Sequence, residues 1–213
     1  MKSGWTSAEL GSIAAVFNGK TPSKDDQRSV GHPVLKIRDV DEFGVWRGLH
    51  QSYVEESFAS TYADKLVRTG DCMVLNAAHN ASHVASKTFR AREDTAGVLA
   101  TGEWLVIRPF DGKLDTGFLH HWLNSVRTRA ALRDAVKGIH LYPKDVSRLR
   151  LAIPPIGEQR RIAAILDKAD ELRAKRRAAL AHLDSLTQSI FLDMFGDPVV
   201  NPMRWPEIGR AHV

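Results

Sequence analysis

The stretch Leu149-Arg150-Leu151-Ala152-Ile153-Pro154-Pro155-Ile156-Gly157-Glu158-Gln159-Arg160-Arg161-Ile162 marks a change from one kind of structure to another. Apolar residues at alternate positions at its start predict a β-strand. The two prolines end this strand, because proline has no backbone N–H to donate and cannot continue a helix backwards. After Gly157, no proline or glycine occurs before Gly196. We therefore expect a globular domain in residues 1–155 and one long helix in residues 156–196.

Glu158 and Gln159 fall in the first turn of this predicted helix. A carboxylate there interacts favourably with the helix dipole, and a glutamine side chain can bond the backbone amides that a helix start leaves free. A contact with a partner subunit is the alternative role for these two residues.

Apolar residues of the helix recur with the heptad period of a coiled coil. Of the ten a and d positions between residues 162 and 193, only Arg176 and Asp193 are not apolar. Such a helix cannot bury its apolar stripe alone, so we expect it to pair with a helix from another copy or from another half. The predicted pairing residues are Ile162, Ile165, Leu172, Leu183, Leu186 and Ile190.

Upstream of the prolines, short apolar runs alternate with polar turns. The predicted strands are Val34–Ile37, Phe43–Trp46, Met73–Leu75, Trp104–Ile107 and Leu149–Ile153. One helix is predicted from Gly117 to Val136, capped by Asp115 and Thr116 and ended by Gly138. The expected fold class is an α/β (α+β) domain with a curved, mixed or largely antiparallel sheet, followed by one long coiled-coil-type helix.

Positive charge is concentrated in one part of the chain. The net charge of the 213 residues is +5. Residues 127–150 alone carry seven basic side chains against Asp134 and Asp145. Concentrated positive charge is what phosphate neutralisation requires, so this window favours a nucleic-acid partner. A solvated helix face followed by a loop is the alternative.

The composition also bounds the location of the protein. Its single cysteine, Cys72, excludes a disulfide within the chain and fits a reducing compartment. No apolar stretch approaches the roughly 20 residues that span a bilayer, and the N-terminus lacks the apolar segment of a signal peptide. We expect a cytoplasmic protein without a membrane partner.

Residues 197–213 form a proline-rich segment that we expect to lead towards a missing second domain. Its last seven residues, 207–213, match one reading frame of a common sequencing adapter, so we expect an assembly artefact there. The natural chain would then continue past Trp205.

The strand–Pro-Pro–Glu-Gln–Ile junction resembles that of specificity (S) subunits of type I restriction–modification systems. Other motifs follow in the order of that family: Trp5, Leu10–Ile13, Gly19–Pro22, Leu35–Val40, Gly70–Asp71 and Gly138. The resemblance covers roughly residues 5–206. It implies a target-recognition domain plus a spacer helix, without catalytic residues or cofactors.

The resemblance also implies partners. Such a subunit binds double-stranded DNA and docks onto a methyltransferase subunit and, through it, a restriction nuclease-translocase subunit. This sequence departs from the family pattern, because it holds one recognition domain instead of two. It is therefore either truncated or a half-length subunit that pairs with itself and reads a symmetric bipartite site.

Base readout needs Arg, Lys, Asn, Gln or His side chains on loops held by a sheet, with phosphate contacts around them. We expect the DNA-binding residues to lie in four regions: after Gly19, on the strand near residue 36, after the strand at residue 75, and after the basic helix. The candidates are Lys20, Thr21, Lys36, Arg38, His79, Asn80, His83, Lys87, Arg90, Lys137, His140 and Lys144. Lys36 and Arg38 are expected on one face of a strand.

Enzyme motifs are weak in this sequence. Asp111-Gly112-Lys113 loosely matches a magnesium nuclease with Glu93 or Asp94, but Asp-Gly after a proline predicts a tight turn. The pairs His120-His121 and His79/His83 lack evident further metal ligands. We expect no catalytic, metal or cofactor site. The alternative function is a coiled-coil interaction module with a basic globular head.

Overall fold

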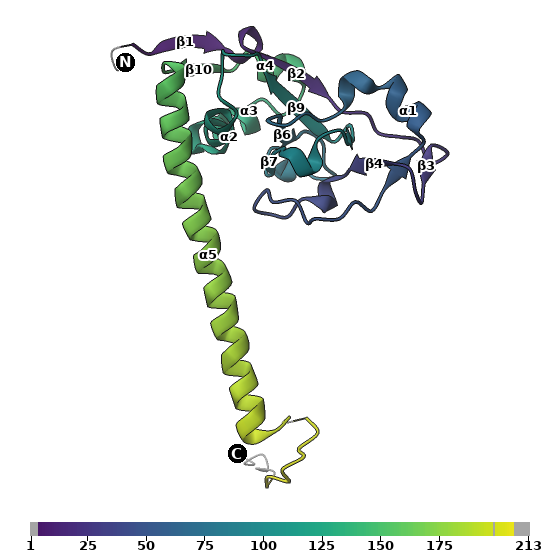
Figure 1. Cartoon of the computed structure of the whole chain (residues 1–213), viewed down its shortest axis with the longest axis vertical. Coiled ribbons are helices and arrows are strands. Elements are labelled where there is room, and N and C mark those ends of the chain that lie inside the picture. Colours follow the sequence, from purple (N-terminus) through teal and green to yellow (C-terminus); the bar gives the residue numbers. More distant parts are fainter. Residues whose placement is uncertain (1–3, 198, 207–213) are drawn as a thin grey trace. The chain divides into compact units, whose positions relative to one another are not determined.

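The part of the chain in residues 4–155, which we name the head, has a four-stranded antiparallel sheet at its centre (Figure 1). In spatial order its strands are β2 (Ala14–Asn18), β9 (Trp104–Pro109), β6 (Cys72–Leu75) and β7 (Thr88–Arg90). All of β6 and the first four residues of β9 are buried. Because neighbouring strand residues point to opposite faces, this burial requires that both faces of the sheet be covered.

The computed structural model describes residues 4–197 and 199–206. The chain divides into a first unit that reaches Leu166 and a second unit that begins at Asp167. Residues 207–213, where we expect an assembly artefact, lie outside the described residues. No helix among the described residues is long and apolar enough to cross a bilayer.

Two smaller sheets complete the strand arrangement of the first unit. The first pairs β1 (Thr6–Glu9) with β10 (Arg150–Ile153). The second has the order β3 (Gln27–Arg28), β5 (Tyr53–Val54), β4 (His32–Leu35) and β8 (Leu99–Ala100). The pair β4–β8 is parallel and the other pairs are antiparallel. The expected mixed, largely antiparallel strand arrangement is therefore confirmed.

Different elements cover the two faces of the central sheet. Cys72 and Val74 face a core formed with α2 (Thr116–Asn124), α3 (Val126–Asp134) and α4 (Pro143–Ser147). Met73 faces a second core, shared with the strands β4 and β8. Helix α1 (Glu56–Thr61) packs in a third, smaller core with β4, β5 and β8. Short 3-10 turns connect these elements: η1 (Leu10–Ser12), η2 (Ile37–Asp39), η3 (Ala63–Lys65), η4 (Ala81–His83) and η5 (Glu93–Thr95).

Two predicted elements differ in the structure. The helix predicted over residues 117–136 is two helices, α2 and α3, because Ser125 adopts an extended conformation and caps α3 through its side chain. The strand predicted over Phe43–Trp46 is a turn. There Asp41 Oδ1 accepts hydrogen bonds from the backbone N–H groups of Phe43 and Val45, which offers the backbone an alternative to a strand ladder.

The long helix α5 (Ile156–Phe195) starts directly beside the head. Gln159 is buried there: its Oε1 accepts from the backbone N–H of Asp115 at 2.8 Å, and its Nε2 donates to the Pro154 carbonyl at 2.9 Å. Ala163 packs against Gly117, where an added Cβ would lie 2.9 Å from the alanine Cβ. The first turns of α5 are thus fastened to the start of α2.

In the second unit, the exposed surface of α5 carries ion pairs and apolar side chains together. Lys168 and Lys175 both bond Glu171, at 2.8 and 2.6 Å, and lower the pKa of its carboxyl to about 2. The helix ends at Phe195, before Gly196 with φ +74°. The indole N–H of Trp205 donates to the Phe195 carbonyl at 2.9 Å, which satisfies one of the carbonyls that a helix end leaves free.

Candidate nucleic-acid interface

One end of the central sheet gathers most of the predicted DNA-binding residues. At this end, which we name the loop end, β2 finishes at Asn18 and β6 at Leu75, while β9 begins at Trp104 and β7 at Thr88. The register sets these four strand ends side by side: Asn18 pairs with Leu105, Leu75 with Trp104, and Thr88 with Val74. Loops that leave these strands therefore share one surface.

Asn76 organises the loop end. It is buried, its backbone N–H donates to the Glu103 carbonyl at 2.8 Å, and its side chain donates to Asn18 Oδ1 at 2.9 Å. The Asn76 carbonyl accepts from the backbone N–H of Leu141 at 2.8 Å. Three loops that are distant in sequence are thus tied to one buried residue whose polar groups are paired.

Lys20 and Thr21 lie in the loop that follows β2. The Lys20 ammonium is 4.7 Å from the centroid of the Tyr62 ring, a cation–π distance. Thr21 Oγ1 accepts from the backbone N–H of Gly102 at 2.9 Å. Gly19 allows this close approach, since an added Cβ would lie 2.3 Å from the carbonyl oxygens of Ala100 and Thr101. Both candidate residues are therefore at the loop end, and both have contacts within the head.

Lys36 and Arg38 do not alternate on a strand, as the sequence predicts, because β4 ends at Leu35 and the 3-10 turn η2 follows. Asp39 causes this turn by accepting from the Lys36 backbone N–H at 2.7 Å. Lys87, at the start of β7, donates to the carbonyls of Ile37 at 3.2 Å and Val40 at 2.6 Å. Burial, and then Arg47, lower its pKa. Lys87 therefore holds the turn that carries Lys36 and Arg38.

The loop after β6 and the loop before α4 lie together. Ala77 and His140 form an antiparallel bridge, which brings the first loop next to the second. The first loop exposes His79, Asn80 and His83, the second exposes Lys137 and His140, and Lys144 is exposed in the first turn of α4. Lys137 is paired with Asp145 at 2.7 Å. These six candidates thus form one polar, basic surface at the loop end.

Arg90 lies apart from the other candidates. It pairs with Cys72 at the opposite end of the sheet, and its guanidinium is beside Gly117 at the start of α2. Burial raises the pKa of the neighbouring Cys72 thiol, while Arg90 acts in the opposite direction. The structure therefore does not bring Arg90 together with Lys20, His79 or Lys137.

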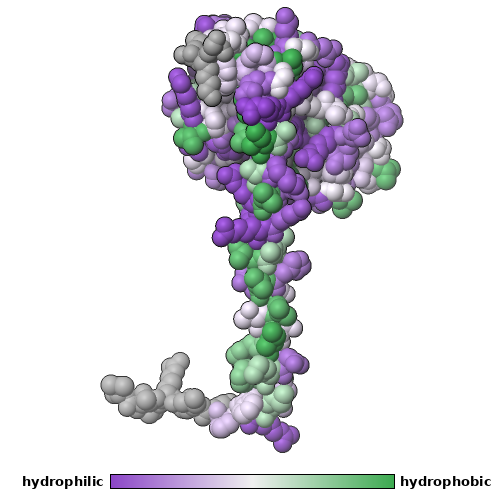
Figure 2. Space-filling view, turned by 60° about the vertical axis from the view of Figure 1, so that its left-hand side comes forward, coloured by the Kyte–Doolittle hydropathy of each residue, from purple (hydrophilic) through white to green (hydrophobic). Residues whose placement is uncertain are grey.

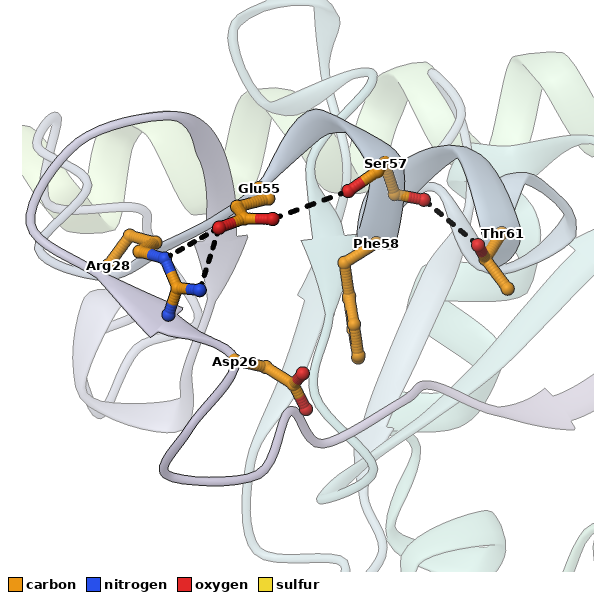
Figure 3. A pocket seen from close by; sticks show the side chains of 6 residues that line it. All are labelled: Asp26, Arg28, Glu55, Ser57, Phe58 and Thr61. Carbon is orange, nitrogen blue, oxygen red and sulfur yellow. Dashed lines mark hydrogen bonds and ion pairs between the residues drawn. The ribbon is translucent and has the colours of Figure 1, made fainter.

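The head also holds a pocket of about 260 Å³ near β3 and α1 (Figure 3). Its walls are Asp26, Arg28, Glu55, Ser57, Phe58 and Thr61. Arg28 donates to Glu55 Oε1 through Nε at 3.0 Å and Nη2 at 2.7 Å. Hydrogen bonds from Ser23 hold the pKa of Asp26 below its usual range. Ser57 Oγ donates to Glu55 Oε2 at 3.5 Å, a long bond, and the same carboxylate is held by Arg28 through its other oxygen.

The motifs weighed as enzyme sites lie in a turn and in helix α2. Asp111, Gly112 and Lys113 form a turn with Gly112 at φ +69°, as the alternative interpretation predicts. His120 and His121 lie in α2 with their rings 5.6 Å apart. In the part of the chain that the structure describes, no group of three or more His, Cys, Asp or Glu side chains could hold a metal ion.

Comparison with protein families decides the classification. Residues 2–182 match the model of the type I restriction modification DNA specificity domain. The chain belongs to this family. No curated protein sequence matches it.

Solved structures resemble this specificity domain along most of its length. A chain from a study of complex assembly and conformational transition of the type I R-M system has a TM-score of 0.69 at 20% identity, covering 89% of this chain and 44% of that one. The HsdS subunit of Thermoanaerobacter tengcongensis gives 0.62 at 21%, covering 92% and 46%. The type I S subunit of M. genitalium gives 0.53 at 14%, covering 90% and 45%. These likenesses concern the fold, and the specificity domain spans less than half the length of each of these chains.

Two arginines at the loop end of the specificity domain are not among the sequence candidates. Arg129 donates to the Ser86 carbonyl at 2.9 Å, and burial followed by the charge of Arg133 lowers its pKa. Arg47 follows the turn at Asp41 and is exposed. The charge of the 127–150 window points to Arg129, whereas Arg47 follows a segment predicted as a strand and has no sequence signal of its own.

The predicted pairing residues of α5 divide between two environments. Ile162 packs against the core of the head. The side chains of Leu172, Leu183 and Leu186 are exposed, with relative exposures of 57%, 57% and 54%. Figure 2 shows apolar side chains along this helix, most densely near its C-terminal end. Ile165 and Ile190 are exposed as well.

Proposed function

We propose that this chain reads one half of a bipartite DNA site as the specificity component of a type I restriction–modification complex. The loop end of the central sheet would contact the duplex. The observation that carries the proposal is the bridge between Ala77 and His140, because it joins the loop of His79 and Asn80 to the loop of Lys137. Because its proposed partner is DNA, we propose that the protein acts in the cytoplasm.

The chemistry of the loop end suits both kinds of DNA contact. Lysine ammonium groups neutralise phosphates and set the register of a protein on the duplex. Asparagine and histidine side chains can donate to and accept from base edges in the grooves. Asn76 and Lys87 hold the loops from behind through hydrogen bonds to backbone groups. Such preformed loops lose little conformational freedom on binding.

The helix α5 would supply the partner contacts. We propose residues 1–155 as the recognition domain and residues 156–196 as the spacer, paired through Ile165, Leu172, Leu183, Leu186 and Ile190 with a second copy or a second recognition half. Residues 197–213 would lead on to a second domain. Paired spacers would set the distance between two half-sites and direct methyltransferase and nuclease subunits to them. The exposure of these leucines supports the proposal, since an apolar stripe on a helix is stable when a partner buries it.

A salt titration of duplex binding tests the recognition proposal. Each phosphate contact releases counterions, so removing one lowers the slope of log affinity against log salt by about 0.9. We expect Lys144→Ala to lower this slope by one contact. The matched control, Lys113→Ala, removes an exposed lysine at the opposite end of the sheet and should leave the slope unchanged. Equal effects of the two variants would contradict the proposed surface.

One observation favours a second function. The exposed stripe of α5 is also what a coiled-coil interaction module needs, with the head binding protein instead of DNA. This alternative predicts that the chain shows no salt-dependent affinity for duplex DNA, even together with its partner subunits.

A further inference from the structure

The loop of residues 39–50, which we name the apolar turn, exposes several apolar side chains. Phe43, Val45 and Leu49 have relative exposures of 56%, 57% and 63%. The turn lies at the loop end, because Gly44 packs so closely on the start of β7 that an added Cβ would lie 2.3 Å from the Thr88 carbonyl oxygen. Its apolar side chains are thus next to the candidate DNA-binding surface.

The apolar turn is held in shape by its own backbone. Asp41 accepts from the N–H groups of Phe43 at 2.9 Å and Val45 at 2.8 Å, and its own N–H donates to the Val45 carbonyl at 2.8 Å. The Arg47 N–H donates to the Asp39 carbonyl at 2.9 Å. Gly44, with φ +78°, makes the tight reversal possible. These bonds therefore hold the backbone that carries Phe43 and Val45 in one conformation.

Buried polar atoms without hydrogen-bond partners gather behind this turn. They are Asp39 Oδ1, Trp46 Nε1 and His50 Nδ1. The Trp46 and His50 rings are 5.0 Å apart, and the Arg38 Nε is 3.9 Å from Asp39 Oδ1. Burial lowers the pKa of His50, while Asp39 and Asp94 act in the opposite direction. A buried polar atom is normally paired, so these three atoms are exceptions within the apolar turn.

We propose that the apolar turn inserts Phe43 and Val45 among the bases of bound double-stranded DNA, as a contact to bases rather than to phosphates. The inference rests on the proposed function and adds a reading element to it.

Charge decides between bases and phosphates. Asp39 is buried and Asp41 is bonded by backbone N–H groups, while Glu42 and Arg47 are exposed. The turn therefore has no excess of positive charge with which to neutralise phosphates. Phosphate binding is left to basic residues outside the turn, among them Lys36. Exposed apolar side chains on a rigid turn suit thymine methyl groups, or the step between two base pairs, where apolar wedges open the stack.

Photo-crosslinking locates this contact directly. Benzoylphenylalanine replaces Phe43 in the full chain, and the modified chain is assembled with its methyltransferase subunit. The DNA probe is selected beforehand: it is the set of duplexes that the unmodified complex retains from a random-sequence pool. The matched control carries the same group at Phe110, which is exposed at the opposite end of the sheet. We expect crosslinks to DNA from position 43 and none from position 110.

A second measurement separates base contact from phosphate contact. Phe43→Ala should weaken binding to the retained duplexes about tenfold, the cost of losing one buried aromatic contact, with the salt slope unchanged. Phe110→Ala should change neither quantity.

Four results would overturn the inference. Salt-dependent DNA binding without a crosslink from position 43 would remove it and leave the proposed function intact. A crosslink from position 43 to the methyltransferase subunit, or a lowered salt slope for Phe43→Ala, would show a different contact. Failure of the unmodified complex to bind DNA would remove the inference and the proposed function together.

Discussion

Gln159 has 1% of its surface exposed, yet its whole amide group is paired. One atom accepts from Asp115 at the start of α2, and the other donates to Pro154 at the end of β10. The residue therefore joins three elements at the point where the head passes into α5. From the sequence, Gln159 is expected to bond a backbone amide at the helix start, but the amide it bonds belongs to a different helix.

Gln159→Ala should leave the Asp115 N–H and the Pro154 carbonyl without partners. Removing one partner of a buried hydrogen bond costs about 1–3 kcal/mol, so we expect a loss of stability of that size. Urea unfolding followed by fluorescence measures it. Gln188→Ala, at an exposed position of the same helix, serves as the control and should change stability little. A Gln159→Ala variant as stable as the Gln188→Ala control would contradict the role assigned to Gln159.

At the scale of elements, burial pattern and periodicity determine what could be predicted. The continuous apolar runs of β6 and β9 and the heptad pattern of α5 identify these elements from sequence. The segment Phe43–Trp46 is apolar as well, but the hydrogen bonds of Asp41 make it a turn. A local side-chain bond of this kind competes with the strand and is not visible in the pattern of apolar residues.

The sequence offers the candidate residues of the site but not their assembly at one end of the sheet. Loops rich in Lys, His and Asn stand out in the sequence. Their meeting at the loop end depends on the pairing of Ala77 with His140 and on the bonds of Asn76, which are long-range contacts. The same reason explains Arg90. Its residue type fits DNA binding, but the register of β7 with β6 puts it at the other end of the sheet.

Pairing through α5 is testable at two positions of its exposed stripe. We expect Leu183→Asp together with Leu186→Asp to abolish pairing, because charged side chains at seam positions cannot be buried without partners. The head should remain folded. Sedimentation velocity measures the change, and Ser185→Asp with Gln188→Asp is the matched control on the same helix. An unchanged oligomer, or a wild-type chain that is monomeric with and without its partners, would count against the seam.

In the molecule as a whole, the two ends of the central sheet differ in character. The loop end of the central sheet carries the exposed His79, Asn80 and Lys137. The opposite end carries the buried ion pair of Arg108 with Asp71 at 2.7 Å and the attachment of α5. A protein that reads DNA with one end of a sheet should respond to the duplex at that end alone.

Hydrogen–deuterium exchange of the full chain with its methyltransferase subunit, with and without a random-sequence duplex pool, measures this response directly. We expect slower exchange over residues 76–83 and 137–142 when DNA is bound, and unchanged exchange over residues 110–113 at the opposite end. Slower exchange confined to residues 110–113, or none anywhere in the head while DNA remains bound, would contradict recognition through the loop end.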